Sequence, residues 1–277
     1  MPTPRKKQGR RFRRLVVGAG VLTVAALAAA AWHWQRALPL ERVAVRGFVR
    51  ADSAEVVRLA ALPDSAALFD LDPALIADRV RRAPWVRAAR VRRLPTGTLA
   101  IAVEERTPVA LVVAADGRLS HYLDREGYAL PLRPGDPFDV PLLRGLVPAY
   151  HPTQPVGDAA LLDLLAALAT ADEETAALVS ELTVGAGGEV LLRTSTDGVH
   201  GALAVRLGAG SAEGYAEQLR RLHAFWHQAV LTRPQTRFEV VDLRFDGQIV
   251  TRESEDRSQR SEATGPAARP APLTSDP

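Results

Sequence analysis

The amino-acid sequence predicts an α+β protein that begins with one membrane-spanning helix. Three observations predict this fold class. A long apolar segment near the N-terminus contains no charged residue, residues 40–108 alternate between strand and helix patterns, and residues 109–252 contain mainly short strand patterns with helical interruptions. The 277-residue chain is long enough for two domains that each bury a core.

The predicted membrane segment covers residues 15–34, directly after a basic tail at residues 1–14. Roughly 20 apolar residues in a helix cross the ~30 Å hydrocarbon layer of a bilayer. Because positive flanks stay in the cytoplasm, we expect the tail to be cytoplasmic and the rest of the chain to be exported. Trp32 and Trp34 suit the aromatic belt at the far interface.

This segment allows two other interpretations. A cleavable signal peptide is possible because residues 28–31 are all alanine, but the apolar span is longer than the ~7–15 residues of a signal core. A buried core helix is disfavoured because no polar face is present. A retained anchor is therefore the prediction.

Composition excludes several kinds of site. The chain has no cysteine, so disulfides, thiolate metal sites and a cysteine nucleophile are absent. The formal charge is only +3, with its strongest concentration in the N-terminal tail. Since the tail is followed by an apolar span, we assign its charge to membrane topology and expect no nucleic-acid partner.

The first exported domain, residues 40–108, has a predicted β-α-α-β-β order. Val43 and Val45 alternate in a strand that Gly47 ends, and Asp52 with Glu55 resembles a capping box. A second helix starts at the Asp72-Pro73 step.

Two strands complete this domain. The first is a strongly basic segment at residues 86–94, followed by a turn at residues 95–97. In the second, Leu99, Ile101 and Val103 recur at period two, which predicts one buried face.

These features resemble, in one order, the POTRA module of the bacterial cell-division family FtsQ/DivIB. The matching segments are Val45-Arg46-Gly47, residues 68–72, Pro84-Trp85-Val86, residues 92–95, residues 99–103 and Glu105-Arg106-Thr107-Pro108. The resemblance implies a POTRA domain and, after it, the family's mainly antiparallel β domain with flanking helices.

The second exported domain, residues 109–252, is predicted from short patterns. Residues 124–127 form a turn signal, and residues 141–145 resemble the family's proline–glycine step. Helices are expected over residues 161–169 and 176–182, and strands over residues 189–193 and 202–207.

The end of this domain carries the most specific pattern. Ser211 starts a helix whose apolar face recurs at helical spacing, and a strand follows at residues 238–245. Asp246-Gly247 predicts a two-residue hairpin turn into a last strand at residues 248–252. Residues 241–247 resemble the family's Asp-Leu-Arg strand. The tail at residues 253–277 is charged and proline-rich, and we expect it to be disordered.

No catalytic, cofactor or metal site is expected. His223 and His227 have the i, i+4 spacing of metal ligands, but no carboxylate partner is evident near them in the sequence. Glu104 and Glu105 lie on opposite faces of a strand and are poorly placed to share a proton, so a solvated strand end is the better account. Residues 185–188 follow a helix instead of preceding one, which indicates a turn instead of a phosphate loop.

The resemblance implies a non-enzymatic scaffold at the division septum that links early and late membrane proteins of the division machinery, with no small-molecule substrate. The alternative is an exported POTRA module with a chaperone-like or secretion role. In the family, the last strand receives a segment of a small bitopic coiled-coil partner by β-augmentation. The expected partner-binding residues are Arg244, Phe245, Gly247, Gln248, Ile249, Val250 and Thr251.

The basic strand at residues 86–94 allows two interpretations. It presents a possible steering surface for an acidic partner or anionic lipid, or it is a solvated edge strand that its charge protects from aggregation. The residues of this possible steering surface are Arg87, Arg90, Arg92 and Arg93.

Overall fold

The computed structural model describes residues 6–36, 38–48, 52–63, 65–135, 137–147, 149–196, 201–233 and 235–253, with backbone alone at residues 6–14, 35 and 36. The chain divides into two compact units, Met1–Thr107 and Pro108–Pro277. The predictions for the first five residues and for the tail beyond residue 253 lie outside the described residues.

Helix α1 (Lys6–Arg36) contains the predicted membrane segment. Leu15–Trp34 is one apolar stretch long enough to cross a membrane, and none of it is buried. Leu22 and Val24 are among its exposed side chains. A helix that is apolar on all sides and uncovered by protein is suited to lipid, so it is not a core helix of either unit.

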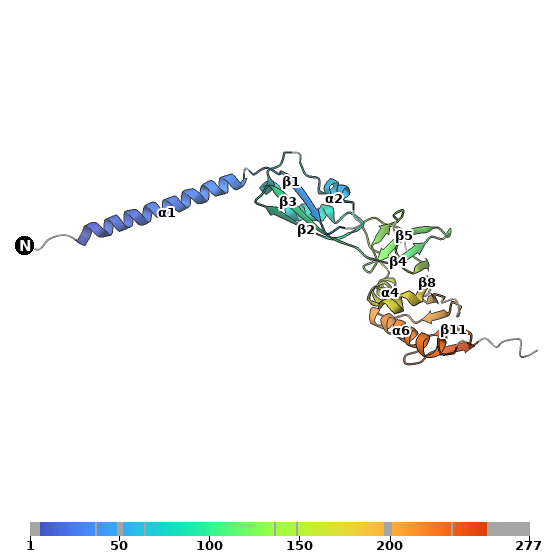
Figure 1. Ribbon diagram of the computed structural model, residues 1–277. Helices are drawn as coiled ribbons and strands as arrows, with labels where there is room; N and C mark the ends of the chain where they lie inside the picture. The colour runs from blue at the N-terminus through green and yellow to red at the C-terminus, as the bar shows by residue number, and fades with distance from the viewer. Residues whose placement is uncertain are drawn as a thin grey trace, which may run out of the picture. The chain divides into compact units, whose positions relative to one another are not determined.

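The rest of the first unit has the predicted β-α-α-β-β order. Its elements are β1 (Arg42–Arg46), α2 (Ser53–Ala60), the short 3-10 helix η1 (Leu68–Asp70), α3 (Pro73–Val80), β2 (Val86–Leu94) and β3 (Thr98–Glu105). The sheet order is β1-β3-β2, with β1 parallel and β2 antiparallel to the central β3 (Figure 1).

Local capping explains where these helices begin. The Asp52 carboxylate accepts a hydrogen bond from the Ala54 N–H at 2.9 Å, and the Asp72 carboxylate accepts one from the Ala74 N–H at 2.8 Å. Each N-cap satisfies donors that a helix start leaves without partners. The buried faces of α2, α3 and β3 then form the core, with Val56, Ala60, Ile76, Val80, Leu99, Ile101 and Val103 among its residues.

The second unit is built on one nine-stranded sheet. Its strands are β4 (Pro108–Val113), β5 (Leu119–Asp124), β6 (Ala129–Pro131), β7 (Leu142–Gly145), β8 (Val179–Val184), β9 (Val190–Thr194), β10 (Ala204–Leu207), β11 (Phe238–Asp242) and β12 (Val250–Glu253). The spatial order is β12-β11-β10-β9-β8-β7-β4-β5-β6. Pairing is mainly antiparallel, as predicted, with parallel pairs at β4–β7, β7–β8 and β10–β11.

Helices α4 (Ala159–Thr170) and α6 (Ala212–Phe225) lie side by side against this sheet (Figure 1). The short helix α5 (Glu173–Leu178) connects α4 to β8, and a π-helical turn η2 (Trp226–Val230) continues α6. Ser211 caps α6 as predicted, and its apolar face is buried through Tyr215, Leu219, Leu222 and Trp226.

Two of the predicted elements were wrong in extent. Residues 179–182 were assigned to a helix, but α5 ends at Leu178 and Val179–Val184 forms β8. This segment pairs with β7 and β9, and its Val179 and Leu182 side chains are buried in the core of the second unit. Pairing with distant strands thus overrides the local apolar pattern. The strand predicted over residues 238–245 ends at Asp242.

Glycines end two strands at close approaches of the backbone. Gly47 follows β1 with φ +82°, and Gly145 ends β7 with φ +91°. A Cβ at Gly47 would collide with the carbonyl oxygen of Val103, and one at Gly145 with that of Val184. These close contacts explain why glycine stands at both strand ends, since a side chain would not fit at either position.

Candidate protein-binding site

Strand β12 occupies one end of the nine-stranded sheet. It pairs with β11 through Asp242 opposite Val250, Val241 opposite Thr251 and Val240 opposite Arg252. All four of its residues are exposed, and among the described residues no strand pairs with its outer side. β12 is therefore an edge strand that presents backbone donors and acceptors.

The hydrogen bonds on the other side of β11 show which β12 residues face outward. The Leu243 N–H donates to the Arg206 carbonyl of β10 at 2.9 Å, and Arg206 is the Cα partner of Asp242. In a parallel pair, this pattern directs the backbone N–H and C=O groups of Val241 and Leu243 toward β10. The corresponding groups of Val240 and Asp242 then point toward β12. The partners Val250 and Arg252 then point inward, so the N–H and C=O of Thr251 point away from the sheet.

The connection between β11 and β12 differs from the prediction. The expected two-residue hairpin at Asp246-Gly247 is wrong, because the two strands are separated by residues 243–249. The turn itself is present, since the Gln248 N–H donates to the Phe245 carbonyl at 3.3 Å and Gly247 has φ +68°. Gln248 and Ile249 thus belong to the connection instead of the strand.

Arg221 of α6 holds this connection in place, a role that the local sequence pattern does not indicate. Its guanidinium donates to the carbonyl oxygens of Leu243 at 3.4 Å and Phe245 at 3.0 Å, and also to that of Gln248. One cation thus satisfies three carbonyls of a segment that lacks a regular ladder. Arg221 therefore positions the residues that lead into β12.

Arg244 folds back onto Asp242, the last residue of β11. Its Nε lies 2.9 Å from Oδ1 of Asp242 and its Nη2 lies 2.6 Å from Oδ2. These hydrogen bonds hold the pKa of the Asp242 carboxyl below its usual value and raise the pKa of Arg244. The pair fixes the orientation of a guanidinium whose side chain is still 47% exposed.

An apolar group accompanies this charge. The Phe245 ring is 51% exposed and lies 5.9 Å from the Arg244 guanidinium carbon, measured to the ring centroid. Ile249 and Val250 are also exposed. The structure thus brings the predicted partner-binding residues into one connection and edge strand, with an oriented cation, an exposed aromatic ring and an open backbone.

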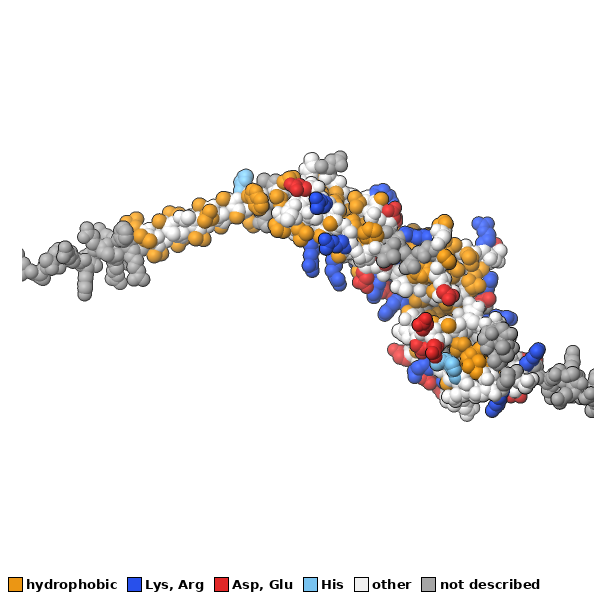
Figure 2. Space-filling model, viewed as in Figure 1, with side chains coloured by type: hydrophobic (Ala, Val, Ile, Leu, Met, Phe, Trp, Pro, Cys, Tyr) orange, Lys and Arg blue, Asp and Glu red, His pale blue; other side chains and the backbone are white. Residues whose placement is uncertain are grey.

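The four arginines predicted as a steering surface divide into two pairs. Arg87 forms an ion pair with Glu104 of β3 at 2.9 Å, and Arg93 donates to the Phe69 carbonyl at 2.8 Å. Arg90 and Arg92 are exposed and make no ion pair with any described residue. Figure 2 shows basic side chains gathered along this part of the first unit. Of these four arginines, Arg90 and Arg92 are therefore the exposed ones for which the described residues provide neither an ionic partner nor a hydrogen bond.

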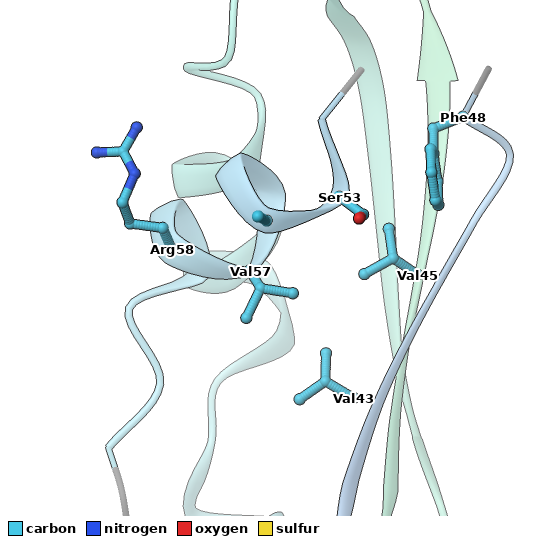
Figure 3. A pocket seen from close by; sticks show the side chains of 7 residues that line it. Val43, Val45, Phe48, Ser53, Val57 and Arg58 are labelled. Atoms are coloured by element: carbon cyan, nitrogen blue, oxygen red, sulfur yellow. The ribbon is translucent and has the colours of Figure 1, made fainter. Parts of the chain in front are cut away.

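A shallow apolar groove of about 540 Å³ lies between β1 and α2. Its walls are formed by Val43 and Val45 of β1 and by Val57 of α2, with Phe48 at one end (Figure 3). Ser53 and Arg58 are its only polar lining residues among those described. Among its described lining residues, no acid, base and nucleophile converge.

One exclusion made from the sequence is corrected by the structure. No carboxylate partner was expected near His223 and His227, but Oε2 of Glu174 lies 3.3 Å from Nε2 of His223. Glu174 belongs to α5, and helix packing brings it to α6 across 49 positions of sequence. Only the packing of two helices, which the local pattern does not encode, reveals this cluster.

Comparison with known proteins assigns the family. A model of the FtsQ-type POTRA domain matches residues 38–106, and a model described as FtsQ/DivIB, C-terminal related, matches residues 107–252. The cell division protein FtsQ of Rhodothermus marinus is 48% identical over 95% of this chain and 95% of its own length. This chain belongs to the FtsQ/DivIB family of cell division proteins.

A second relative supports the same family assignment. FtsQ of Salinibacter ruber is 40% identical over 86% of this chain and 92% of its own length. The FtsQ-type POTRA match spans β1 to β3, and the FtsQ/DivIB C-terminal match ends at residue 252, inside β12. The connection at residues 243–249 and the first three residues of the edge strand therefore lie within the part of the chain that the family model matches. The resemblance read from the sequence is confirmed, and with it a role in cell division.

Proposed function

We propose that this FtsQ-family chain is a non-enzymatic scaffold of the division machinery, anchored by α1, and that β12 binds a partner by β-augmentation. The scaffold links early and late membrane proteins of the septum. The observation that carries the proposal is the outer edge of β12, where the backbone of Thr251 points away from β11.

The topology of the proposal follows from charge. The arginines and lysines before residue 15 precede an apolar span, so the N-terminus lies in the cytoplasm and both folded units lie on the exported side. A reporter that is active only outside the cytoplasm, fused after Arg252, is expected to be active.

The partner is proposed from the resemblance and from the site. In the family, a small bitopic coiled-coil protein supplies the incoming segment. Here the Arg244 guanidinium and the Phe245 ring lie in the connection that leads into the edge strand, so the segment should carry an acidic group and an apolar side chain beside its backbone-pairing residues. Because Asp242 and Arg221 already orient this region, little side-chain ordering is needed on binding.

Thr251→Pro tests the proposal most selectively within β12. Proline removes the outward N–H and places its ring where a partner strand would pair, while edge strands tolerate proline when the lost donor faces solvent. We expect at least tenfold weaker partner binding, or about 1.4 kcal/mol, with little change in fold stability. Thr251→Val keeps the N–H and is the matched control.

Val250→Pro is the complementary variant, because it should affect fold stability as well as partner binding. Its N–H points toward β11, so this substitution breaks the inner ladder and should lower the stability of the second unit as well as binding. Partner affinity and chemical denaturation are measured on the full chain in detergent. Unchanged affinity in folded Thr251→Pro would place the partner site elsewhere.

A further inference from the structure

Three potential metal ligands meet where α5 packs against α6. The ligand atoms of Glu174, His223 and His227 all lie within 4.8 Å of one another. Glu174 is in the first turn of α5, His223 is in the last turn of α6, and His227 is in the π-helical turn η2. On this face of the second unit, Figure 2 shows histidine side chains in contact with acidic ones.

The fold holds the two histidines at this spacing. Leu222, Trp226 and Val230 are buried in the core of the second unit, which fixes the rotation of α6 and η2 about their axis. The imidazole rings consequently share one face, with centroids 4.5 Å apart and planes at 86°. A π-helical turn inside a helix is frequently associated with a functional site.

The distances suit a tetrahedral zinc ion. Zinc binds imidazole nitrogen and carboxylate oxygen at about 2.0–2.2 Å, so neighbouring ligand atoms in a tetrahedral site lie roughly 3.3–3.5 Å apart. Nε2 of His223 and Oε2 of Glu174 are already 3.3 Å apart. Because Glu174 and His227 are exposed, small side-chain rotations bring the third atom to the same separation.

A second observation concerns His223 alone. Its Nε2 is buried and forms no hydrogen bond with any described residue, although the Glu174 carboxylate lies beside it. A buried polar atom without a hydrogen bond is costly, and in native proteins it commonly marks an ion or water site. A metal ion bound at this nitrogen removes that cost.

We propose that Glu174, His223 and His227 bind one Zn²⁺ ion, which staples α5 to α6 and leaves a fourth position for water or for a partner's ligand. A His₂Glu set with imidazole donors favours zinc, copper or nickel over magnesium and calcium. Binding would stabilise the folded second unit by mass action. It would also hold α6, which carries Arg221, two residues before His223. The zinc proposal does not rest on β-augmentation at β12 and can fail or hold separately from it.

Zinc binding is tested on the full chain in detergent, purified without a polyhistidine tag. The probe is zinc chloride alone, measured by competition with a chromogenic chelator and by the shift in melting temperature. We expect one zinc ion per chain with a dissociation constant at or below about 1 µM, equivalent to ~8.2 kcal/mol, and a rise in melting temperature that chelation reverses.

Substitutions identify the ligands. His227→Gln and Glu174→Gln alter exposed side chains, so the chain should fold while zinc affinity falls at least tenfold. Glu173→Gln, one position away in the same turn, is the matched control and should bind as the wild type does. Cobalt substitution should give the visible spectrum of a tetrahedral nitrogen and oxygen site, since the chain has no cysteine.

Either of two outcomes would overturn the proposal. One is the absence of saturable zinc binding at micromolar concentration. The other is stoichiometric binding that Glu174→Gln and His227→Gln leave unchanged, because the ion would then lie elsewhere.

Discussion

The two edges of the nine-stranded sheet are built in opposite ways. Strand β6 has three residues, buries Ala129 and Leu130, and ends at Pro131, which has no N–H to offer. Strand β12 is fully exposed and contains no proline. One edge is short and buried, whereas no described residue pairs with the outer side of the other edge. A sheet with one such edge can accept a partner strand there.

The connections beside the two edges also differ. Asp124 organises the turn before β6 by accepting hydrogen bonds from the Glu126 and Tyr128 N–H groups, both within five residues of it. The connection before β12 depends on Arg221, which lies 22 residues from Leu243 and 27 from Gln248. The closed edge is a local structure, and the open edge is assembled from distant parts of the sequence.

The largest expected effect is a difference in stability between substitutions at the two edges. Leu130→Ala removes a fully buried side chain of β6 and should lower the free energy of unfolding by about 2–5 kcal/mol. Val250→Ala trims a side chain that is 48% exposed and should change it by less than about 0.5 kcal/mol. Chemical denaturation of the second unit measures both. Equal losses would contradict the contrast between the edges.

The next effect concerns the positioning of the open edge. Arg221→Gln removes the cation that satisfies three carbonyls of the connection, so the partner should bind about tenfold more weakly, or by ~1.4 kcal/mol. Arg220→Gln is the matched control, because the ion pair that Arg220 forms with Glu217 lies on the exposed surface of the same helix. Titration of the partner measures the difference. If both variants bind alike, the connection does not depend on Arg221.

A smaller effect is expected on the first unit. Replacing Arg90 and Arg92 together by Gln removes exposed charge that no described acidic residue pairs, and should slow association with an acidic partner or anionic vesicles several-fold at low salt. The difference should disappear at high salt because exposed charges are screened. Arg87→Gln is the comparison, since its charge is paired with Glu104. Association rates that do not depend on salt would favour the solvated-edge interpretation.

The smallest effect is a pH dependence at the open edge. Arg244 lowers the pKa of Asp242, so the pair contributes stability above the unfolded carboxyl pKa of ~3.9, and the contribution is lost as pH falls through the lower folded value. Wild type should therefore be more stable than Arg244→Gln at pH 6, and the two should converge as the pH falls below about 4. Denaturation midpoints across this range provide the measurement. A difference that grows toward low pH would have the wrong sign.

Short-range features were predictable from the sequence. Caps at Asp52, Asp72 and Ser211 and the apolar stripes behind them depend on residues a few positions apart, and the structure confirms them. The turn at residues 185–188 is likewise present between β8 and β9, with Gly188 at φ +76°. Neighbouring residues carry enough information for such elements.

Long-range features were not predictable in this way. Val179–Val184 forms a strand because β7 and β9 flank it, and Glu174 meets His223 because two helices pack together. The seven-residue connection before β12 is held by a side chain from another element, so the Asp246-Gly247 signal alone suggested too tight a turn. Tertiary contacts decided each of these outcomes.

Amide hydrogen exchange at Thr251, with and without the partner, tests β-augmentation most directly. In the free chain, the Thr251 amide should exchange rapidly, while the amides of Val250 and Arg252 are protected by pairing with β11. Partner binding should slow exchange at Thr251 at least tenfold and change the other two little. An amide of Thr251 that still exchanges rapidly in the saturated complex would contradict strand addition at this edge.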